Sequence, residues 1–120
     1  MQQGFYTVVK QERQTTAEIF TVEIDSSHPV FDGHFPTRKI VPGVMLIYII
    51  KDLFETITKK KLKLTGANTI KFLQVINPDV GKLLRIKIES TPNPLQINCQ
   101  IFLNEKICFK MDGTFESIER

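Results

Sequence analysis

The sequence predicts an α+β fold in which an antiparallel sheet accompanies one long helix. Two strand-like segments come first, a strongly apolar helical segment follows, and three or four further strands are joined by tight turns. The strand segments alternate apolar and polar residues, whereas the helical segment is almost continuously apolar in its first half. At 120 residues the chain is long enough for one core, so we expect a single domain over residues 1–120.

The first two strands are expected at Phe5–Val9 and Thr15–Ile24, with residues 10–14 as a polar connection. The second should be half-buried, because alternate residues place one apolar set on one face: Phe20, Val22 and Ile24. Residues 25–29 then break the strand with Asp, Ser and Pro. Within this break we expect His28 to be a polar loop residue.

The helix is expected at Gly43–Thr58. Its segment from Val44 to Ile50 has almost no polar face, which is typical of a buried helix. A single small sheet cannot cover every side of a helix, so we expect a second subunit or a ligand chain to cover the rest. From Lys51 onward the pattern is amphipathic, and it predicts Asp52 and Glu55 on the solvated side.

Four further strands are expected after the helix, at Leu62 to about Ile76, Leu83–Glu89, Leu95–Leu103 and Ile107–Phe115. Turn-forming residues separate them, and Asn104-Glu105 is expected to be a two-residue hairpin connection. Cys99 and Cys108 fall on strands expected to be neighbours. In a chain expected to be cytoplasmic they are interpreted as reduced core residues rather than a disulfide.

Composition excludes several function classes. The net charge of +3 is small and no basic stripe alternates with aromatic residues, so we expect no nucleic-acid partner. The longest uncharged apolar run, residues 40–50, is too short to cross a bilayer, and the N-terminus does not resemble a secretory signal. We therefore expect no membrane insertion and a cytoplasmic location. Neither cysteine has a partner at metal-site spacing, so no metal is expected.

The stretch from Gly33 to Val44 carries the candidate chemistry. It places His34 on a turn-rich loop with prolines at positions 36 and 42, and Pro42-Gly43 then opens the apolar helix. The first backbone N–H groups of a helix favour a carbonyl oxygen or an oxyanion. Taken alone, the residues fit two interpretations equally: a site for carbonyl chemistry, or a loop that covers the helix end with His34 merely hydrogen-bonded.

One stretch of the sequence consists of Gly33-His34-Phe35-Pro36, three further residues, and Ile40-Val41-Pro42-Gly43-Val44 before an apolar helix. This stretch resembles the active-site segment of the beta-hydroxyacyl-acyl carrier protein dehydratases. A weaker similarity follows at Ile70-Lys71-Phe72 and Asn77-Pro78-Asp79. The resemblance implies a hotdog fold, in which the sheet wraps the central helix, and a homodimer or a dimer-based oligomer. It also implies an acyl carrier protein thioester as substrate, with no cofactor.

The resemblance further implies roles for individual residues. His34 would take the α-proton, since an imidazole with a pKa of about 6.5 suits a base at neutral pH. The N–H groups of Gly43 and Val44 would hold the enolate oxygen. Phe35 and Pro42 would contact substrate. Fourteen residues after His34, where the family has Glu or Asp, this chain has Tyr48, a much weaker acid than a carboxyl group. The nearest alternative acids in the sequence are Asp32, Asp52 and Glu55.

Three function classes follow: a dehydratase, a thioesterase of the same fold, or a non-catalytic acyl-thioester binder that pairs with an active homologue. The last is suggested directly by Tyr48. A basic cluster after the helix has two interpretations, a solvated helix end or a docking patch for an acidic carrier protein; its members are Lys59, Lys60, Lys61 and Lys63.

Overall fold

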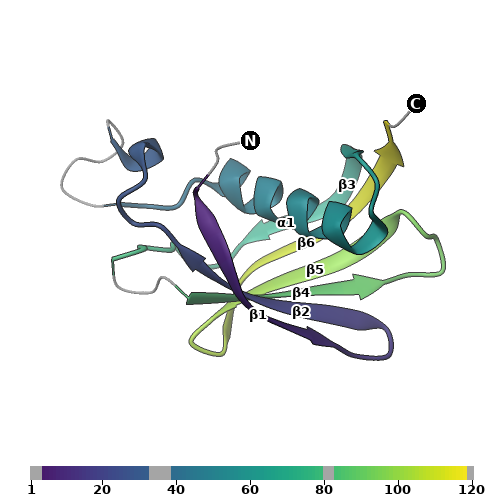
Figure 1. Cartoon of the computed structure of the whole chain (residues 1–120), viewed down its shortest axis with the longest axis horizontal. Coiled ribbons are helices and arrows are strands. Elements are labelled where there is room, and N and C mark those ends of the chain that lie inside the picture. Colours follow the sequence, from purple (N-terminus) through teal and green to yellow (C-terminus); the bar gives the residue numbers. More distant parts are fainter. Residues whose placement is uncertain (1–3, 33–38, 80–82, 119–120) are drawn as a thin grey trace.

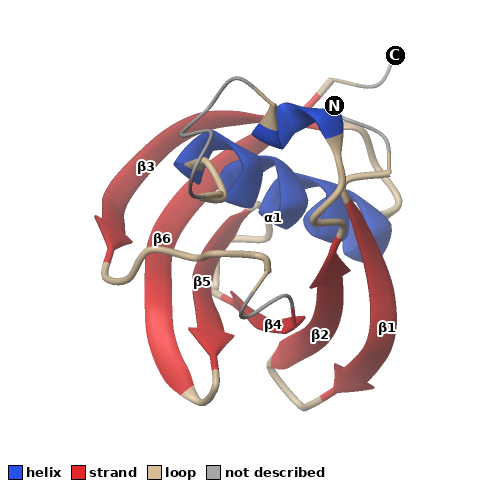
Figure 2. Cartoon of the chain, turned by 90° about the vertical axis from the view of Figure 1, so that its left-hand side faces the viewer, coloured by secondary structure: helices blue, strands red, loops and turns tan. Residues whose placement is uncertain are grey.

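Six strands form one antiparallel sheet that curves around a single long helix, as Figures 1 and 2 show. The computed structural model describes residues 4–32, 39–79 and 83–118. In chain order the elements are β1 (Tyr6–Arg13), β2 (Ala17–Ile24), a 3₁₀ turn η1 (Pro29–Phe31), α1 (Gly43–Thr58), β3 (Leu62–Phe72), β4 (Leu83–Ser90), β5 (Gln96–Leu103) and β6 (Lys106–Ser117). The sheet order is β1-β2-β4-β5-β6-β3, and α1 lies along its concave face (Figure 2). The predicted α+β class is confirmed.

The core lies between α1 and the inner face of the sheet. Phe20, Val22 and Ile24, which were predicted to share one buried face of β2, are buried, and so are Leu84, Ile86 and Ile88 on β4. The helix contributes the face formed by Met45, Leu46, Ile49, Ile50, Leu53 and Phe54. Full burial of such side chains stabilises a fold by roughly 1.5–3 kcal/mol each, so this interface holds α1 against the sheet.

Several boundaries differ from the sequence prediction. β1 continues to Arg13, well past Val9, because a bulge between Val8 and Lys10 interrupts the alternation without ending the pairing with β2. β3 ends at Phe72 rather than near Ile76. The N–H groups of Leu73 and Gln74 both donate to the Cys108 carbonyl, at 2.9 and 3.3 Å, which turns the chain out of the ladder.

The helix and the β5–β6 turn follow the prediction closely. α1 spans Gly43–Thr58 as expected. Asn104 and Glu105 both have positive φ, 51° and 68°, as a type I′ hairpin turn requires. Lys59, also at positive φ, ends the helix by donating its N–H to the Glu55 carbonyl at 2.7 Å.

His28 is more buried than a solvated loop residue, with 7% of its surface exposed. Its Nδ1 accepts the Val30 N–H at 2.9 Å, and its ring contacts that of Phe5 edge-on at 5.5 Å between centroids. The side chain therefore caps η1, just before the Gly33–Val44 stretch. Its predicted non-catalytic character agrees with this capping role.

Cys99 and Cys108 are buried free thiols, as predicted. Burial raises the pKa of Cys108 to about 11, and burial together with the Asp112 charge raises that of Cys99 further. Both are therefore protonated at neutral pH. Among the described residues, no helix combines the length and the hydrophobicity that a bilayer crossing demands.

Candidate active site

The N-terminus of α1 has no side-chain cap. Pro42 occupies the N-cap position with extended geometry, and its carbonyl accepts the Met45 N–H at 3.0 Å. The Val41 N–H donates to the Ile76 carbonyl at 2.9 Å, which fixes the chain just before the helix. The backbone N–H groups of Gly43 and Val44 are thus the first of the helix, where the dipole favours an electronegative ligand atom. His34 and Phe35, the predicted base and a predicted substrate contact, lie outside the described residues.

Gly43 lies directly against the ring of Phe72, at the end of β3. A Cβ built on Gly43 would lie 2.4 Å from Cε1 and 2.7 Å from Cζ of that ring, so any larger residue here would force the exposed Phe72 ring or the helix start to shift. This contact brings the end of β3 to the helix start. Phe72 was not among the predicted site residues, and its place in the Ile70-Lys71-Phe72 similarity is the sequence signal that points to it.

Tyr48 and Val44 lie on the side of α1 that faces away from the sheet. They are one turn apart on one helix face and are 38% and 54% exposed. The sheet thus leaves one side of the first half of α1 uncovered within the single chain, as expected, and the second subunit or ligand chain predicted to cover that side stays a prediction. Tyr48 lies about 7 Å along the axis from Gly43, at a rise of about 1.5 Å per residue, within reach of a ligand held at the helix start.

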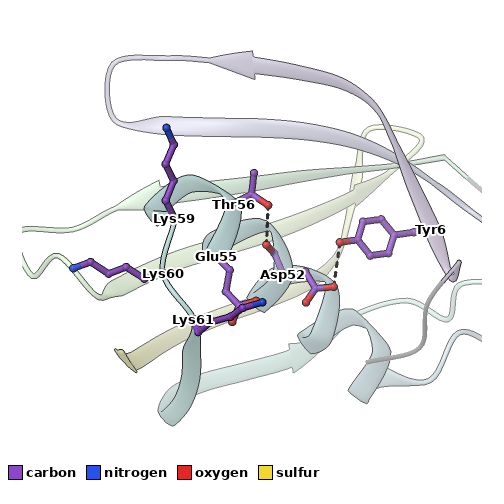
Figure 3. A pocket seen from close by; sticks show the side chains of 7 residues that line it. All are labelled: Tyr6, Asp52, Glu55, Thr56, Lys59, Lys60 and Lys61. Atoms are coloured by element: carbon purple, nitrogen blue, oxygen red, sulfur yellow. Dashed lines mark hydrogen bonds between the residues drawn. The ribbon is translucent and has the colours of Figure 1, made fainter. Parts of the chain in front are cut away.

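A polar cavity of ≈ 470 Å³ lies further along the same side of α1 (Figure 3). It is lined by Tyr6, Asp52, Glu55, Thr56, Lys59, Lys60 and Lys61. The Tyr6 hydroxyl donates to Asp52 Oδ2 at 3.3 Å, and Figure 3 shows these two side chains pointing toward each other. Contrary to the prediction of a solvated position, Asp52 is half-buried between β1 and α1.

Burial raises the pKa of Asp52, against the opposing effects of Lys51 and the Tyr6 hydrogen bond. Burial first, and then the Asp52 carboxylate, also raises the pKa of Tyr6. A carboxyl group with a raised pKa is a candidate acid. Asp52 lies about 13 Å along the axis from Gly43, however, which places it beyond the reach of a substrate carbonyl held there.

The Asp52→Asn variant is expected to be more stable than the wild type at neutral pH. The raised pKa means that the folded state disfavours the carboxylate, while an amide still accepts the Tyr6 hydrogen bond. In the wild type, the Asp52 carboxyl group does not lower the folding stability at pH values below its ordinary pKa of about 3.9, where it is protonated. The loss of stability develops as the pH rises through the pKa of Asp52 in the folded state. Thermal unfolding at pH 7 and pH 3.5 should therefore show a gain that shrinks on acidification. An equal gain at both pH values would contradict this account.

The other two alternative acids hold structural positions. Glu55 Oε2 accepts Lys51 Nζ at 3.3 Å and the Leu62 N–H at 2.8 Å, so it joins α1 to the start of β3. Asp32 is exposed and its N–H donates to the Pro29 carbonyl at 2.9 Å, as expected of a turn residue. In the described part of the chain, no three His, Cys, Asp or Glu side chains are grouped as metal ligands would be.

Comparison with known proteins is consistent with this geometry. The chain is 26% identical over 105 residues to the 3-hydroxyacyl-[acyl-carrier-protein] dehydratase FabZ of Lactiplantibacillus plantarum, covering 81% of this chain and 71% of that one. It is 27% identical over 90 residues to FabZ of Zymomonas mobilis, covering 69% and 54%. These sequence relatives are dehydratases, and they are distant ones.

Solved structures show the same fold. A chain of the dehydratase heterocomplex ApeI:P from Xenorhabdus doucetiae superposes with a TM-score of 0.78 at 18% identity, over 91% of this chain and 96% of that one. A putative thioesterase from Shewanella oneidensis superposes with a TM-score of 0.58 at 13% identity, over 95% and 84%. The predicted hotdog fold is thus confirmed. The family model for the ApeI dehydratase matches residues 9–111, and the chain therefore belongs to the ApeI-like family of hotdog-fold dehydratases.

Proposed function

We propose that this protein removes water from a 3-hydroxyacyl thioester carried by an acyl carrier protein, in fatty acid or related lipid or polyene biosynthesis in the cytoplasm. The start of α1 carries the proposal: its N-cap makes no side-chain hydrogen bond, its first residue is a glycine packed on Phe72, and Tyr48 lies just over one turn further. Membership of a dehydratase family supports the reaction type. No cofactor is needed for the chemistry.

In the proposed reaction, neutral His34 takes the proton from the carbon beside the thioester carbonyl. The carbonyl oxygen gains negative charge and is stabilised by the N–H groups of Gly43 and Val44 at the positive end of the helix dipole. As the double bond forms, the C–O bond of the hydroxyl breaks and the oxygen leaves as water. The proton it requires comes either from the Tyr48 hydroxyl, which is then reprotonated by the imidazolium, or directly from His34.

A second subunit is part of the proposal. Six large apolar side chains are exposed around the helix start and the β3 edge of the sheet, with Phe72 joining the two regions: Val44, Tyr48, Ile70, Phe72, Leu73 and Val75. Monomeric soluble proteins rarely expose a patch of this kind without a partner. We infer that a homodimer covers this surface and that the substrate's acyl chain lies beside it.

The direct test is mass spectrometry of 3-hydroxyacyl carrier protein incubated with the purified protein. Loss of the mass of one water molecule, with the thioester intact, would support the proposal. Release of free acid and thiol would identify a thioesterase instead. An unchanged substrate across short, medium and long acyl chains would contradict the single-protein dehydratase.

A non-catalytic partner subunit is the second candidate function. Tyr48 favours it, because a phenol stands where the resemblance expects a carboxylic acid, and loss of an acid or base partner typically costs about 100- to 10,000-fold. One structurally similar chain was solved as part of the dehydratase heterocomplex ApeI:P. Co-purification of a second hotdog protein, with dehydration only by the complex, would favour this candidate.

Reversal of charge in the basic cluster is expected to weaken the use of a carrier-bound substrate. Lys59 and Lys60 border the Figure 3 cavity, and Lys63 follows on β3; all three are exposed. Changing them together to Glu should raise KM for the carrier protein thioester about ten-fold or more, because acidic carriers would be repelled. KM for a small pantetheine thioester should not change. Lys106→Glu, on the hairpin at the other end of the sheet, is the matched control (Figure 1). An unchanged carrier KM would exclude this docking surface.

A further inference from the structure

The convex face of the sheet carries two parallel rows of polar side chains with opposite character. The basic row runs across four strands through three registered pairs: Lys71↔Lys110, Lys110↔Gln100 and Gln100↔Lys87. The acidic row, two residues further along each strand, runs through Thr69↔Asp112, Asp112↔Asn98 and Asn98↔Glu89. Residues two apart share a face of a strand, so both rows lie on the side away from α1, about 7 Å apart.

The intervening residues confirm which face this is. Ile88, Cys99 and Met111 lie between the two rows along their strands and are buried in the core against α1. The rows therefore project outward, away from the side of the sheet that holds α1 in Figure 2. Most of both rows line a hollow of ≈ 350 Å³ on this face.

No charged member of either row forms an ion pair within the part of the chain that the structure describes. Lys71 and Lys110 are directly opposite each other, an arrangement that is unfavourable for like charges. Lys87, Lys110, Glu89 and Asp112 are nevertheless half-buried, so their charges are only partly solvated.

We infer that the convex face binds a second copy of this chain, face to face. The two copies are related by a two-fold axis that lies midway between the rows and runs perpendicular to the strands. This symmetry places the basic row of each copy over the acidic row of the other, and each strand lies opposite the same strand of the second copy. Lys110 then faces Asp112 of the second copy, Lys87 faces Glu89, and Gln100 faces Asn98. Symmetry doubles each contact, which gives four ion pairs and two amide pairs from one self-complementary surface.

The position of the rows suits such packing. β4 and β5 are the central strands of the sheet order, so the rows cross the middle of the convex face, where two curved sheets would meet. Aligned sheets pack at about −30° with about 10 Å between them. The rows lie on the face of the sheet opposite α1, whereas the surface proposed above for the homodimer lies around the helix start, and the two meet only at the edge strand β3. The inference therefore does not depend on the dehydratase function.

Sedimentation velocity at about 50 mM salt tests the contact, since low salt preserves charge interactions. Lys110→Glu places Glu against Asp112 twice in each interface, and Asp112→Lys places Lys against Lys110 twice. Each variant is expected to halve the assembly mass of the wild type and to raise its dissociation constant at least ten-fold. The double variant, Lys110→Glu with Asp112→Lys, restores opposite charges and should regain the wild-type mass. Lys106→Glu, outside both rows, is the control.

Circular dichroism of each variant distinguishes lost assembly from lost folding. A folded Lys110→Glu variant with the wild-type mass would overturn the inference. So would a folded double variant that stays at half mass, because failure of the exchange to restore assembly would show that the two positions do not face each other. Dissociation of the wild type to half its mass at about 0.5 M salt is also expected, and a mass independent of salt would count against the contact.

Discussion

His34→Ala is expected to reduce the dehydration rate of 3-hydroxyacyl carrier protein by about 100- to 10,000-fold, with little change in thermal stability. The proposed mechanism gives this imidazole the first proton transfer, and the helix start cannot perform that step because it offers only hydrogen-bond donors. Single-turnover measurements by mass spectrometry would report the rate of water loss separately from substrate binding.

Two further variants decide what the imidazole does. His34→Gln keeps a polar, hydrogen-bonding side chain of similar reach, so it should be as slow as His34→Ala if the group is a base. If His34→Gln retained most of the activity, the imidazole would be only a hydrogen-bonding residue of the loop. If His34 can return the proton to the leaving group, Tyr48→Phe should lower the rate by a smaller factor than His34→Ala does. If the phenol is the sole proton donor, the two variants should lose activity by comparable factors.

Gly43→Ala is expected to lower both stability and activity, because the new methyl group would lie 2.4 Å from Cε1 of Phe72. Overpacking a core typically costs about 1–3 kcal/mol, and the loss of stability here should lie at or below the lower end of that range because the Phe72 ring is 60% exposed and can move. The ring or the helix start must shift, and a displaced helix start would no longer present its N–H groups correctly. We expect a lower melting temperature and a drop of about ten-fold or more in kcat/KM, since small misplacements are costly in catalysis.

The chain offers a matched control and a compensating change for this variant. A Cβ on Gly66, also in β3, would meet nothing within 4 Å, so Gly66→Ala should leave both quantities nearly unchanged. Adding Phe72→Ala to Gly43→Ala should recover part of the lost activity, a non-additivity expected of residues in contact. Strictly additive losses would show that the two residues act independently.

Elements that depend on adjacent residues, namely α1 and the Asn104-Glu105 hairpin turn, could be predicted from the sequence. The Pro42-Gly43 pair and the apolar run that follows define α1, and Asn104-Glu105 defines its hairpin, because helix starts and tight turns depend on adjacent residues. The end of β1 was predicted wrongly because residues 10–13 are polar, which is also typical of a connection between strands. In the edge strand β1 these side chains are mostly exposed, and the backbone pairing with β2 continues past the bulge after Val8.

The surroundings of the site depend on contacts between distant segments. Tyr6 and Asp52 are 46 positions apart, and Phe72 reaches Gly43 only because β3 returns along the edge of the sheet. No periodicity encodes either contact. The exposure of Tyr48 likewise follows from how much of α1 the curved sheet covers, which is a property of the assembled sheet rather than of the helix sequence.

The position of β3 in the sheet also constrains when the chain can fold. β3 is made directly after α1, yet its only neighbour in the described sheet is β6, and their register pairs Leu62 with Ser117 and Phe72 with Phe109. At a synthesis rate of about 5–20 residues per second, the nascent chain would hold β3 unpaired for several seconds. Closing so distant a pairing is also slow in itself. The apolar end of β3 therefore has to avoid association with other chains until translation reaches the last strand. The pairings of β1, β2, β4 and β5 can form earlier, but the sheet is completed only when β6 has been made.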